Sequence, residues 1–139
     1  MPAPRDPVAG IIRAANLLNR SLAPVLERGG ITPQQWAVLS VIGAAAAPMT
    51  LAAMGKELAV TKQNMTGMVS RLEQLGLVER LEDPADLRSS RVQLTRRGRK
   101  MIGRMTSAYQ RWVRSLGSER DLRQLAGAVS RLIARLEES

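Results

Sequence analysis

The chain of 139 residues contains no cysteine and no histidine. The lack of cysteine excludes disulfide bonds, thiolate catalysis and cysteine-based redox sensing. The lack of histidine removes the most common metal ligand and the most common general base. The remaining acidic and basic side chains form no recognisable acid–base cluster, and the chain has no glycine-rich phosphate loop. We therefore expect a protein that is not an enzyme and that holds no metal and no cofactor.

Aromatic residues are scarce, at 2% of the chain, and none is phenylalanine, so the core must be aliphatic. This composition disfavours a base-stacking platform for single-stranded nucleic acid, which needs exposed aromatic side chains. No apolar run approaches the ~18 residues that a membrane span needs, and the first residues contain no hydrophobic signal-peptide segment. We expect a cytoplasmic protein with no membrane partner.

Positive charge, in contrast, is abundant. The formal net charge is +9 and the isoelectric point is near 11.5. Such a balance points towards a polyanion, either nucleic acid or an acidic membrane surface. Basicity alone favours nucleic acid only by about two to one. The length suits one domain, or one small domain with an extension that needs a partner.

Capping signals divide the chain into six helices. Asp6 and Thr32 each precede a proline, which suits the first helical position, and Thr32 also forms a capping box with Gln35. Gly76 is expected in the left-handed conformation that ends the fourth helix, while Leu116-Gly117 breaks the fifth. The predicted helices run from Pro7 to near Arg28, from Pro33 to before Pro48, from Leu51 to Leu58, from Thr61 to Leu75, from Thr95 to near Leu116, and from Ser118 onwards, with Thr50, Thr61, Thr95 and Ser118 as the other caps.

The third and fourth helices are short and are separated by a tight turn, which is the arrangement of a helix-turn-helix. Residues 77–82 and 90–94 alternate in hydrophobicity and are predicted to be strands. The polar loop 83–89 joins them into a hairpin, the wing. A polar helix followed by a charged hairpin is typical of a unit that binds double-stranded DNA.

The fourth helix has one apolar face, because its apolar residues follow helical spacing. The opposite face offers amides, which suit the N6/N7 edge of adenine, and Lys, Thr and Ser side chains, which suit phosphates or guanine. Gly67 costs ~1 kcal/mol relative to alanine in a helix, and the absence of a side chain would let the helix sit deeper in the major groove. An ordinary solvated face is the alternative for this helix taken alone. The predicted apolar residues are Met65, Met68, Val69, Leu72 and Leu75, and the predicted DNA contacts are Thr61, Lys62, Gln63, Asn64, Thr66, Gly67, Ser70 and Arg71, with Asp86, Arg88 and Arg91 in the wing.

Asp86 and Arg88 lie two residues apart at the tip of the wing, so the carboxylate can orient the guanidinium. An oriented arginine fits the narrow, negative minor groove of A·T-rich DNA. The alternative is a surface ion pair worth ~0–1 kcal/mol with no function. From residue 96 to residue 114 the chain has seven basic residues and no acidic one. Those nearest the wing can bind phosphate, whereas Arg111 and Arg114 lie too far along a helix that rises ~1.5 Å per residue.

The first and sixth helices carry apolar stripes, and the stripe of the sixth approaches a coiled-coil seam. Because these helices flank a self-sufficient winged unit, a second copy of the chain across a two-fold axis is the simplest way to bury the stripes. At ~1.5–3 kcal/mol per leucine-sized side chain, the homodimer should be obligate. A monomeric helical bundle is the alternative. We thus predict a mainly α fold with a small β-hairpin wing, in which residues 31–98 form a winged helix-turn-helix lobe and residues 1–30 and 99–139 form a helical dimerisation region.

Four stretches give this chain a resemblance to the MarR (multiple antibiotic resistance regulator) family. They are ITPQQWAVL at 31–39, LAVTKQNMT at 58–66, RLEQLGLVER at 71–80 and the highly specific wing motif DPADLR at 83–88, with Val92, Leu94-Thr95 and Gly98 following. The resemblance covers nearly the whole chain. It implies a homodimeric transcription factor, usually a repressor, that binds a pseudo-palindromic operator and is released by small aromatic anions such as salicylate. By position, Lys62, Gln63, Asn64, Thr66 and Ser70 match the family's helix contacts, and Asp86 and Arg88 match its wing pair.

One position departs from the family pattern, because Leu87 stands where a second arginine is usual, and this puts an extra wing phosphate contact in doubt. The absence of Cys and His also rules out the family's cysteine-oxidation and zinc modes, so that a small-molecule effector or no effector remains. The resemblance implies an effector site between the dimer helices and the winged lobe. The matching positions are Arg13, Asn16, Trp36, Arg88, Tyr109 and Trp112.

In that site Arg13 can pair with a carboxylate, and the aromatic side chains can sandwich a ring. An equally good alternative makes Trp36 and Trp112 plain core residues and Arg13 a surface charge, since pockets and cores are built from the same residues. The expected partners are double-stranded DNA, a second copy of the chain and a small aromatic acid. The rival function is a sequence-indifferent, architectural chromosome-binding protein without an effector.

Overall fold

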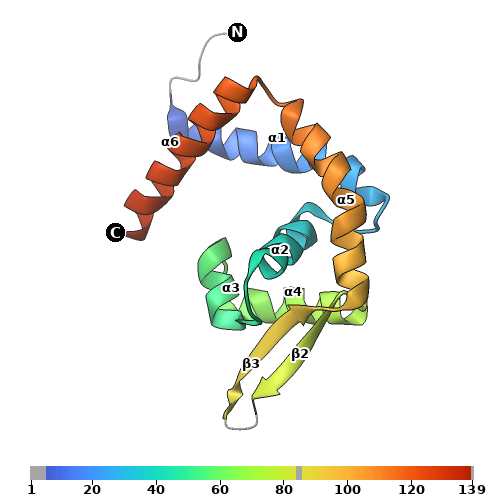
Figure 1. Cartoon of the computed structure of the whole chain (residues 1–139). Helices are drawn as coiled ribbons and strands as arrows, with labels where there is room; N and C mark the ends of the chain where they lie inside the picture. Colours follow the sequence, from blue (N-terminus) through green and yellow to red (C-terminus); the bar gives the residue numbers. More distant parts are fainter. Residues whose placement is uncertain (1–5, 84–85, 139) are drawn as a thin grey trace.

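The computed structural model describes residues 6–83 and 86–138, and the side chains of residues 83–89 lie outside the described part. The chain is mainly helical and has one small antiparallel sheet, which confirms the predicted fold class. In chain order the elements are α1 (Pro7–Glu27), α2 (Pro33–Ala44), β1 (Met49–Thr50), α3 (Leu51–Leu58), α4 (Lys62–Gln74), β2 (Val78–Asp83), β3 (Asp86–Leu94), α5 (Arg96–Arg114) and α6 (Glu119–Glu137) (Figure 1).

The helices begin where the capping signals predict. Each of the six predicted N-cap side chains accepts a hydrogen bond from a backbone N–H two or three residues later. The capping box of α2 is complete, because the Gln35 side chain also accepts from the backbone N–H of Thr32 at 2.9 Å. Gly76, with φ of +75°, takes the predicted left-handed conformation after α4. These starts and stops are local chemistry, and local sequence is enough to predict them.

The sheet differs from the predicted wing in two ways. The loop predicted over residues 83–89 is wrong, because β3 begins at Asp86 and pairs with β2 up to Asp83. The pairing uses backbone groups, so polar residues near a hairpin tip can belong to a strand. The strand β1 was not predicted, and its two residues pair with Val92 and Arg91 of β3. The strand order is β1-β3-β2.

The core lies within the winged lobe and at its junction with α1 and α5, and it is built mainly from aliphatic side chains and methionine. From α4, Met65, Val69 and Leu72 are fully buried, as the helical spacing predicts. The turn between α3 and α4 is tight: Ala59 has a left-handed φ of 55°, and the backbone N–H of Val60 donates to the Gly55 carbonyl at 2.8 Å. This turn sets how α4 is presented on the surface.

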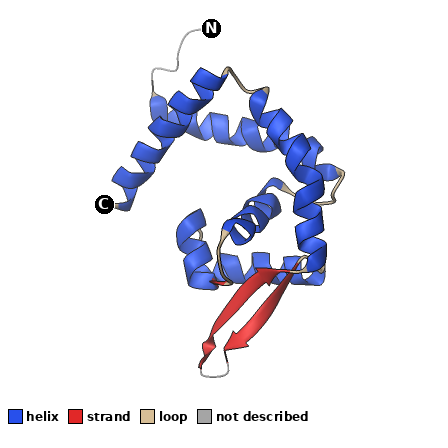
Figure 2. Ribbon diagram, in the orientation of Figure 1, coloured by secondary structure: helices blue, strands red, loops and turns tan. Residues whose placement is uncertain are grey.

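The helices form two groups joined by α5, as Figure 1 shows, with α2, α3, α4 and the sheet at one end and α1 and α6 at the other. The β2–β3 hairpin projects beyond the helices (Figure 2). Much of α1 and α6 faces solvent, with Val8 62% exposed and Leu125 57% exposed. Within residues 6–83 and 86–138, no helix is long and apolar enough to cross a membrane.

Candidate nucleic-acid interface and effector pocket

The N-terminal half of α4 presents the polar face that the sequence predicts. Lys62, Gln63 and Asn64 are all exposed. Two of the predicted contacts have structural roles, however. The Thr61 hydroxyl accepts from the backbone N–H of Asn64 at 3.2 Å, and the Thr66 hydroxyl donates to the Lys62 carbonyl at 3.0 Å. The long side chains of the first turn are therefore the ones best placed to reach a ligand.

The C-terminal half of α4 is tied to the sheet. Arg80 of β2 donates from Nε to Glu73 Oε1 at 2.7 Å and from Nη2 to Ser70 Oγ at 3.2 Å. Ser70 is half-buried, whereas the neighbouring Arg71 is exposed and lies 3.4 Å from Gln74 Oε1. Gly67 is also exposed, and a Cβ added there would meet nothing within 4 Å. Of the predicted contacts on α4, Ser70 is engaged by β2, whereas Lys62, Gln63 and Asn64 are exposed in the first turn.

Exposed basic residues also occur in the elements that follow this helix. Arg91 is exposed on β3, and Arg96, Arg97 and Lys100 are exposed in the first turns of α5. In Figure 1, α4 and the hairpin lie at the same end of the molecule. The side chains of Asp86, Leu87 and Arg88 lie outside the described residues, so the predicted wing pair stays a prediction. The described residues thus include a polar helix surface and several exposed basic side chains in the elements that follow it, which suits a polyanion.

The three aromatic residues proposed for the effector site form a row. The rings of Trp36 and Tyr109 have centroids 5.2 Å apart, and those of Tyr109 and Trp112 have centroids 5.9 Å apart. Trp36 is buried, with 6% exposure, and the Trp112 indole N–H donates to Ser21 Oγ at 2.9 Å. Tilted rings at these distances are favourable contacts in their own right. The row therefore packs α1, α2 and α5 together and can also form the wall of a pocket.

An open pocket of about 420 Å³ lies against this row between α2 and α5. Trp36 and Tyr109 supply an aromatic wall, and Arg99 supplies a guanidinium. Trp112 instead lines a separate pocket of about 450 Å³ between α1 and α5, together with Val25. The other polar groups of the first pocket come from Ser40, Thr106 and Gln110.

The remaining effector candidates lie elsewhere. Arg13 and Asn16 are on the exposed part of α1 and line neither of these pockets. Arg99 is a residue that the sequence analysis missed, although the spacing of Arg99, Thr106 and Tyr109 places them on neighbouring positions of one helical face. The available signal was that spacing within the basic stretch 96–114. It does not say which other helix the face packs against.

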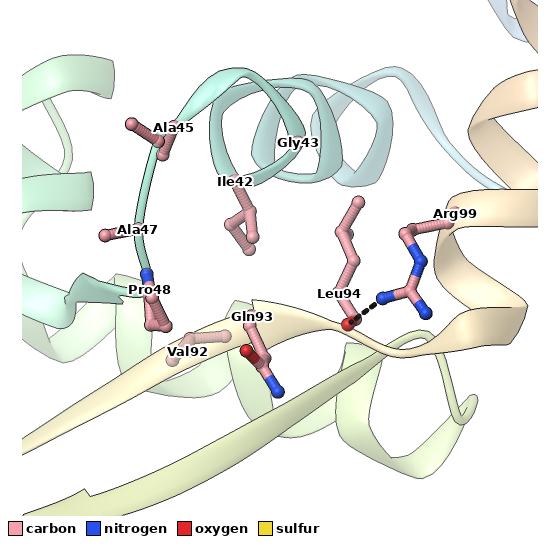
Figure 3. Close-up of a pocket in the computed structure, with 10 residues that line it drawn as sticks. Ile42, Gly43, Ala45, Ala47, Pro48, Val92, Gln93, Leu94 and Arg99 are labelled. Carbon is pink, nitrogen blue, oxygen red and sulfur yellow. Dashed lines mark hydrogen bonds between the residues drawn. The ribbon is translucent and has the colours of Figure 1, made fainter.

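A smaller pocket of about 200 Å³ adjoins the first and shares Gly43, Leu94 and Arg99 with it (Figure 3). Arg99 Nη1 donates to the Leu94 carbonyl at 3.2 Å, so the guanidinium lies where β3 ends and α5 has just begun. The rest of this lining comes from the end of α2, the alanine-rich loop after it, and β3. Arg99 therefore places a positive charge between the pocket beside Trp36 and Tyr109 and this smaller pocket.

The chain is similar to known proteins in sequence and in fold. The MarR family model matches residues 29–89. The transcriptional activatory protein BadR of Rhodopseudomonas palustris is 35% identical over 91 residues, which are 64% of this chain and 52% of BadR, so the match spans about half of that relative.

Solved structures share the fold. A DNA complex of MepR from S. aureus superposes with a TM-score of 0.84 at 20% identity, covering 95% of this chain and 99% of MepR. CouR of Rhodococcus jostii RHA1, bound to p-coumaroyl-CoA, superposes with a TM-score of 0.80 at 18% identity, covering 92% of each chain. The structures show the shared fold, and the sequence matches identify the family: the chain belongs to the MarR family.

Proposed function

We propose that the chain acts as a homodimeric, sequence-specific DNA-binding repressor whose operator affinity is lowered by a small aromatic acid. The observation that carries the proposal is the exposed first turn of α4, formed by Lys62, Gln63 and Asn64, in a lobe that also exposes Arg91 on β3 and basic side chains at the start of α5. Amides there can read base edges, while Arg91 and Lys100 can neutralise phosphates. MepR, which has the same fold, has been crystallised with DNA.

Dimerisation is proposed from the solvent-facing apolar residues of α1 and α6. Ile11 and Ile12 are 49% and 59% exposed, and Leu125 and Ile133 are 57% and 49% exposed. Large apolar side chains exposed along a helix favour association with another surface. A two-fold dimer also presents two copies of α4, as a pseudo-palindromic operator requires. In this proposal residues 31–98 bind DNA and residues 1–30 and 99–139 associate.

Repression follows if the operator overlaps the promoter, because a bound dimer then blocks access to it. The relative BadR is named as an activator, and the same DNA-binding unit can serve either outcome depending on where its site lies. We assign repression to this chain on its family resemblance.

The effector proposal rests on the aromatic pocket. Trp36 and Tyr109 can pack against a ring, and Arg99 can pair with a carboxylate in the same pocket. CouR carries an aromatic acyl-CoA, so a protein of this fold can hold an aromatic acid derivative. Arg13 and Asn16 line neither of the two pockets beside the aromatic row. They remain in the proposal only as exposed residues of α1, a helix whose surroundings dimerisation would change. Salicylate is the simplest probe of this chemistry.

Site selection from a randomised duplex pool tests the proposal against the architectural rival. A specific regulator enriches a two-fold-symmetric motif whose half-sites are spaced by about one helical turn, ~34 Å. A sequence-indifferent protein binds the pool but enriches no motif, and that outcome would contradict the proposed function. Genome-wide mapping of bound DNA then locates the motif relative to promoters and decides between repression and activation.

Asn64 offers a sharper test within the same experiment. If its amide reads a base edge, Asn64→Ala should relax the preference at one position of each half-site and weaken binding by ~1–3 kcal/mol. The capping bond to Thr61 uses the backbone N–H of Asn64 and survives the substitution. An unchanged motif would reassign the Asn64 side chain to phosphate or to solvent.

A further inference from the structure

A single side chain joins the first wing strand to the candidate recognition helix. The Arg80 guanidinium uses two different nitrogens for two acceptors, Glu73 Oε1 at 2.7 Å and Ser70 Oγ at 3.2 Å. The Arg80 and Glu73 side chains are only 28% and 35% exposed. We call these three residues the Arg80 clamp. A partly buried, two-point contact of this kind is more rigid than an exposed ion pair.

The clamp depends on spacing in both elements. Ser70 and Glu73 are three residues apart on α4, so their side chains project from the same face of the helix. Arg80 follows the left-handed turn at Gly76 and the first residues of β2. The planar guanidinium presents separate donors in fixed directions, which a lysine ammonium cannot reproduce.

The clamp has two consequences for a surface that binds DNA. First, it fixes the C-terminal half of α4 relative to β2, so that the helix and the wing approach DNA as one body, with less conformational entropy left to lose on binding. Second, it places a positive charge 2.7 Å from the Glu73 carboxylate, which would otherwise repel phosphates from the recognition helix.

We propose that Arg80 is a positioning residue for operator binding, and that Ser70 acts through Arg80 rather than by contacting DNA. This inference rests on the proposed function. It reassigns Ser70 from the predicted DNA contacts to the support of α4. It also divides the polar face of the helix into an N-terminal part that reads DNA and a C-terminal part that is held by the wing.

A double-substitution cycle tests the inference. The affinity for the duplex enriched by the wild-type chain is measured by fluorescence anisotropy for wild type, Arg80→Met, Ser70→Ala and the double variant. Arg80→Met should weaken binding about tenfold, a loss of the size expected for one coupled contact. In the otherwise wild-type chain, Ser70→Ala should weaken binding about threefold. In the Arg80→Met background the same substitution should cause no further loss.

The control is Arg111→Met, which removes the same charge from the exposed face of α5 far from the wing and should leave affinity nearly unchanged at the same salt concentration. Equal losses from Ser70→Ala in both backgrounds would mean that Ser70 contacts DNA directly, and would overturn the inference. An Arg80→Met variant that binds the operator with wild-type affinity would also overturn the inference. If Arg80→Met fails to fold, Arg80→Lys replaces it in the cycle, because a lysine keeps the charge but cannot donate to both acceptors in fixed directions.

The selection experiment separates this inference from the proposed function. A wild-type chain that enriches no motif overturns both. A wild-type chain that enriches a motif, together with additive effects in the cycle, overturns the clamp alone. An altered motif with Ser70→Ala also overturns it, since a positioning residue changes affinity and leaves base preference as it was.

Discussion

Gly67 is an unusual choice for the middle of an exposed helix, and its surroundings decide what it does. A Cβ at this position would meet no atom within 4 Å, so the glycine relieves no crowding inside the protein. Its neighbours Asn64 and Ser70 lie one turn away on either side. We propose that the glycine allows a close approach from outside, as when a helix enters the major groove of DNA.

Gly67→Ala should therefore move stability and binding in opposite directions. Alanine has the higher helix propensity, so the free energy of unfolding should rise by ~1 kcal/mol. The added methyl should weaken operator binding if α4 enters the groove at this residue. Thermal unfolding and fluorescence anisotropy measure the two effects. A rise in the unfolding midpoint with unchanged affinity would show that DNA does not approach Gly67.

Arg99 illustrates what residue-level reasoning from sequence cannot reach. The three aromatic residues of the chain meet in one row, although Trp112 lines a different pocket from Trp36 and Tyr109. The cation was not found, since Arg13 and Arg99 are equally plausible as sequence. Only the packing of α2 against α5 brings Arg99 beside Trp36 and Tyr109. Which cation faces a pocket is a tertiary property.

At the scale of elements, the sequence predicts what is local. The helix starts follow from side-chain caps such as Asp6 and Thr61, and the end of α4 follows from Gly76. The strand β1 could not be predicted, because two residues are too few to show alternation and their partner β3 lies about forty residues further along the chain. The early start of β3 at Asp86 was not predicted for a related reason. The residues there are polar, and they continue a backbone pairing whose apolar part lies nearer the core.

The turn between α3 and α4 provides a prediction at this scale. A Cβ on Gly55 would lie 2.6 Å from the Val60 carbonyl oxygen, and neither backbone can easily move because Val60 N–H also bonds to the Gly55 carbonyl. Gly55→Ala should destabilise the protein by ~1–3 kcal/mol through overpacking. Thermal unfolding measures this loss.

Gly67→Ala is the matched control for Gly55→Ala, because it makes the same change in the neighbouring helix where there is open space. The two variants should shift the unfolding midpoint in opposite directions. A Gly55→Ala protein as stable as wild type would mean that the turn can relax, and that its geometry is not fixed by the close approach of Val60. DNA affinity of Gly55→Ala then reports how much operator binding depends on the presentation of α4.

At the scale of the whole molecule, the proposed dimer should depend on the apolar stripe of α6. Val129 is 44% exposed and lies near the middle of that stripe. Val129→Glu places a carboxylate in the proposed interface, where burying an unpaired charge is strongly unfavourable. We expect the wild-type chain to sediment as a dimer at micromolar concentration and the variant to dissociate and lose high-affinity operator binding, because one protomer reaches only one half-site.

Ala134→Glu is the control for the dimer, since it adds the same charge to an exposed position away from the stripe. It should leave both sedimentation and DNA binding unchanged. A wild-type chain that sediments as a folded 15.2 kDa monomer would contradict the dimer directly. Dissociation in both variants would instead place the interface over a different face of α6.

Induction connects the pocket to the spacing of the two recognition helices. A ligand that enters between α2 and α5 would shift the winged lobe relative to α1 and α6, and the two copies of α4 must meet grooves ~34 Å apart. We expect salicylate to lower operator affinity and to quench tryptophan fluorescence, because Trp36 lies in the pocket wall. Arg99→Ala should weaken salicylate binding more than Arg13→Ala does.

Thermodynamic linkage makes this prediction strict. If salicylate weakens operator binding by some factor, operator DNA must weaken salicylate binding by the same factor. Calorimetric titration of salicylate into the free protein and into the protein–operator complex measures the second factor, and anisotropy measures the first. Equal salicylate affinity with and without operator would show that the compound is not an effector, even if it occupies the pocket beside Trp36, because a ligand that binds both states equally cannot shift the balance between them.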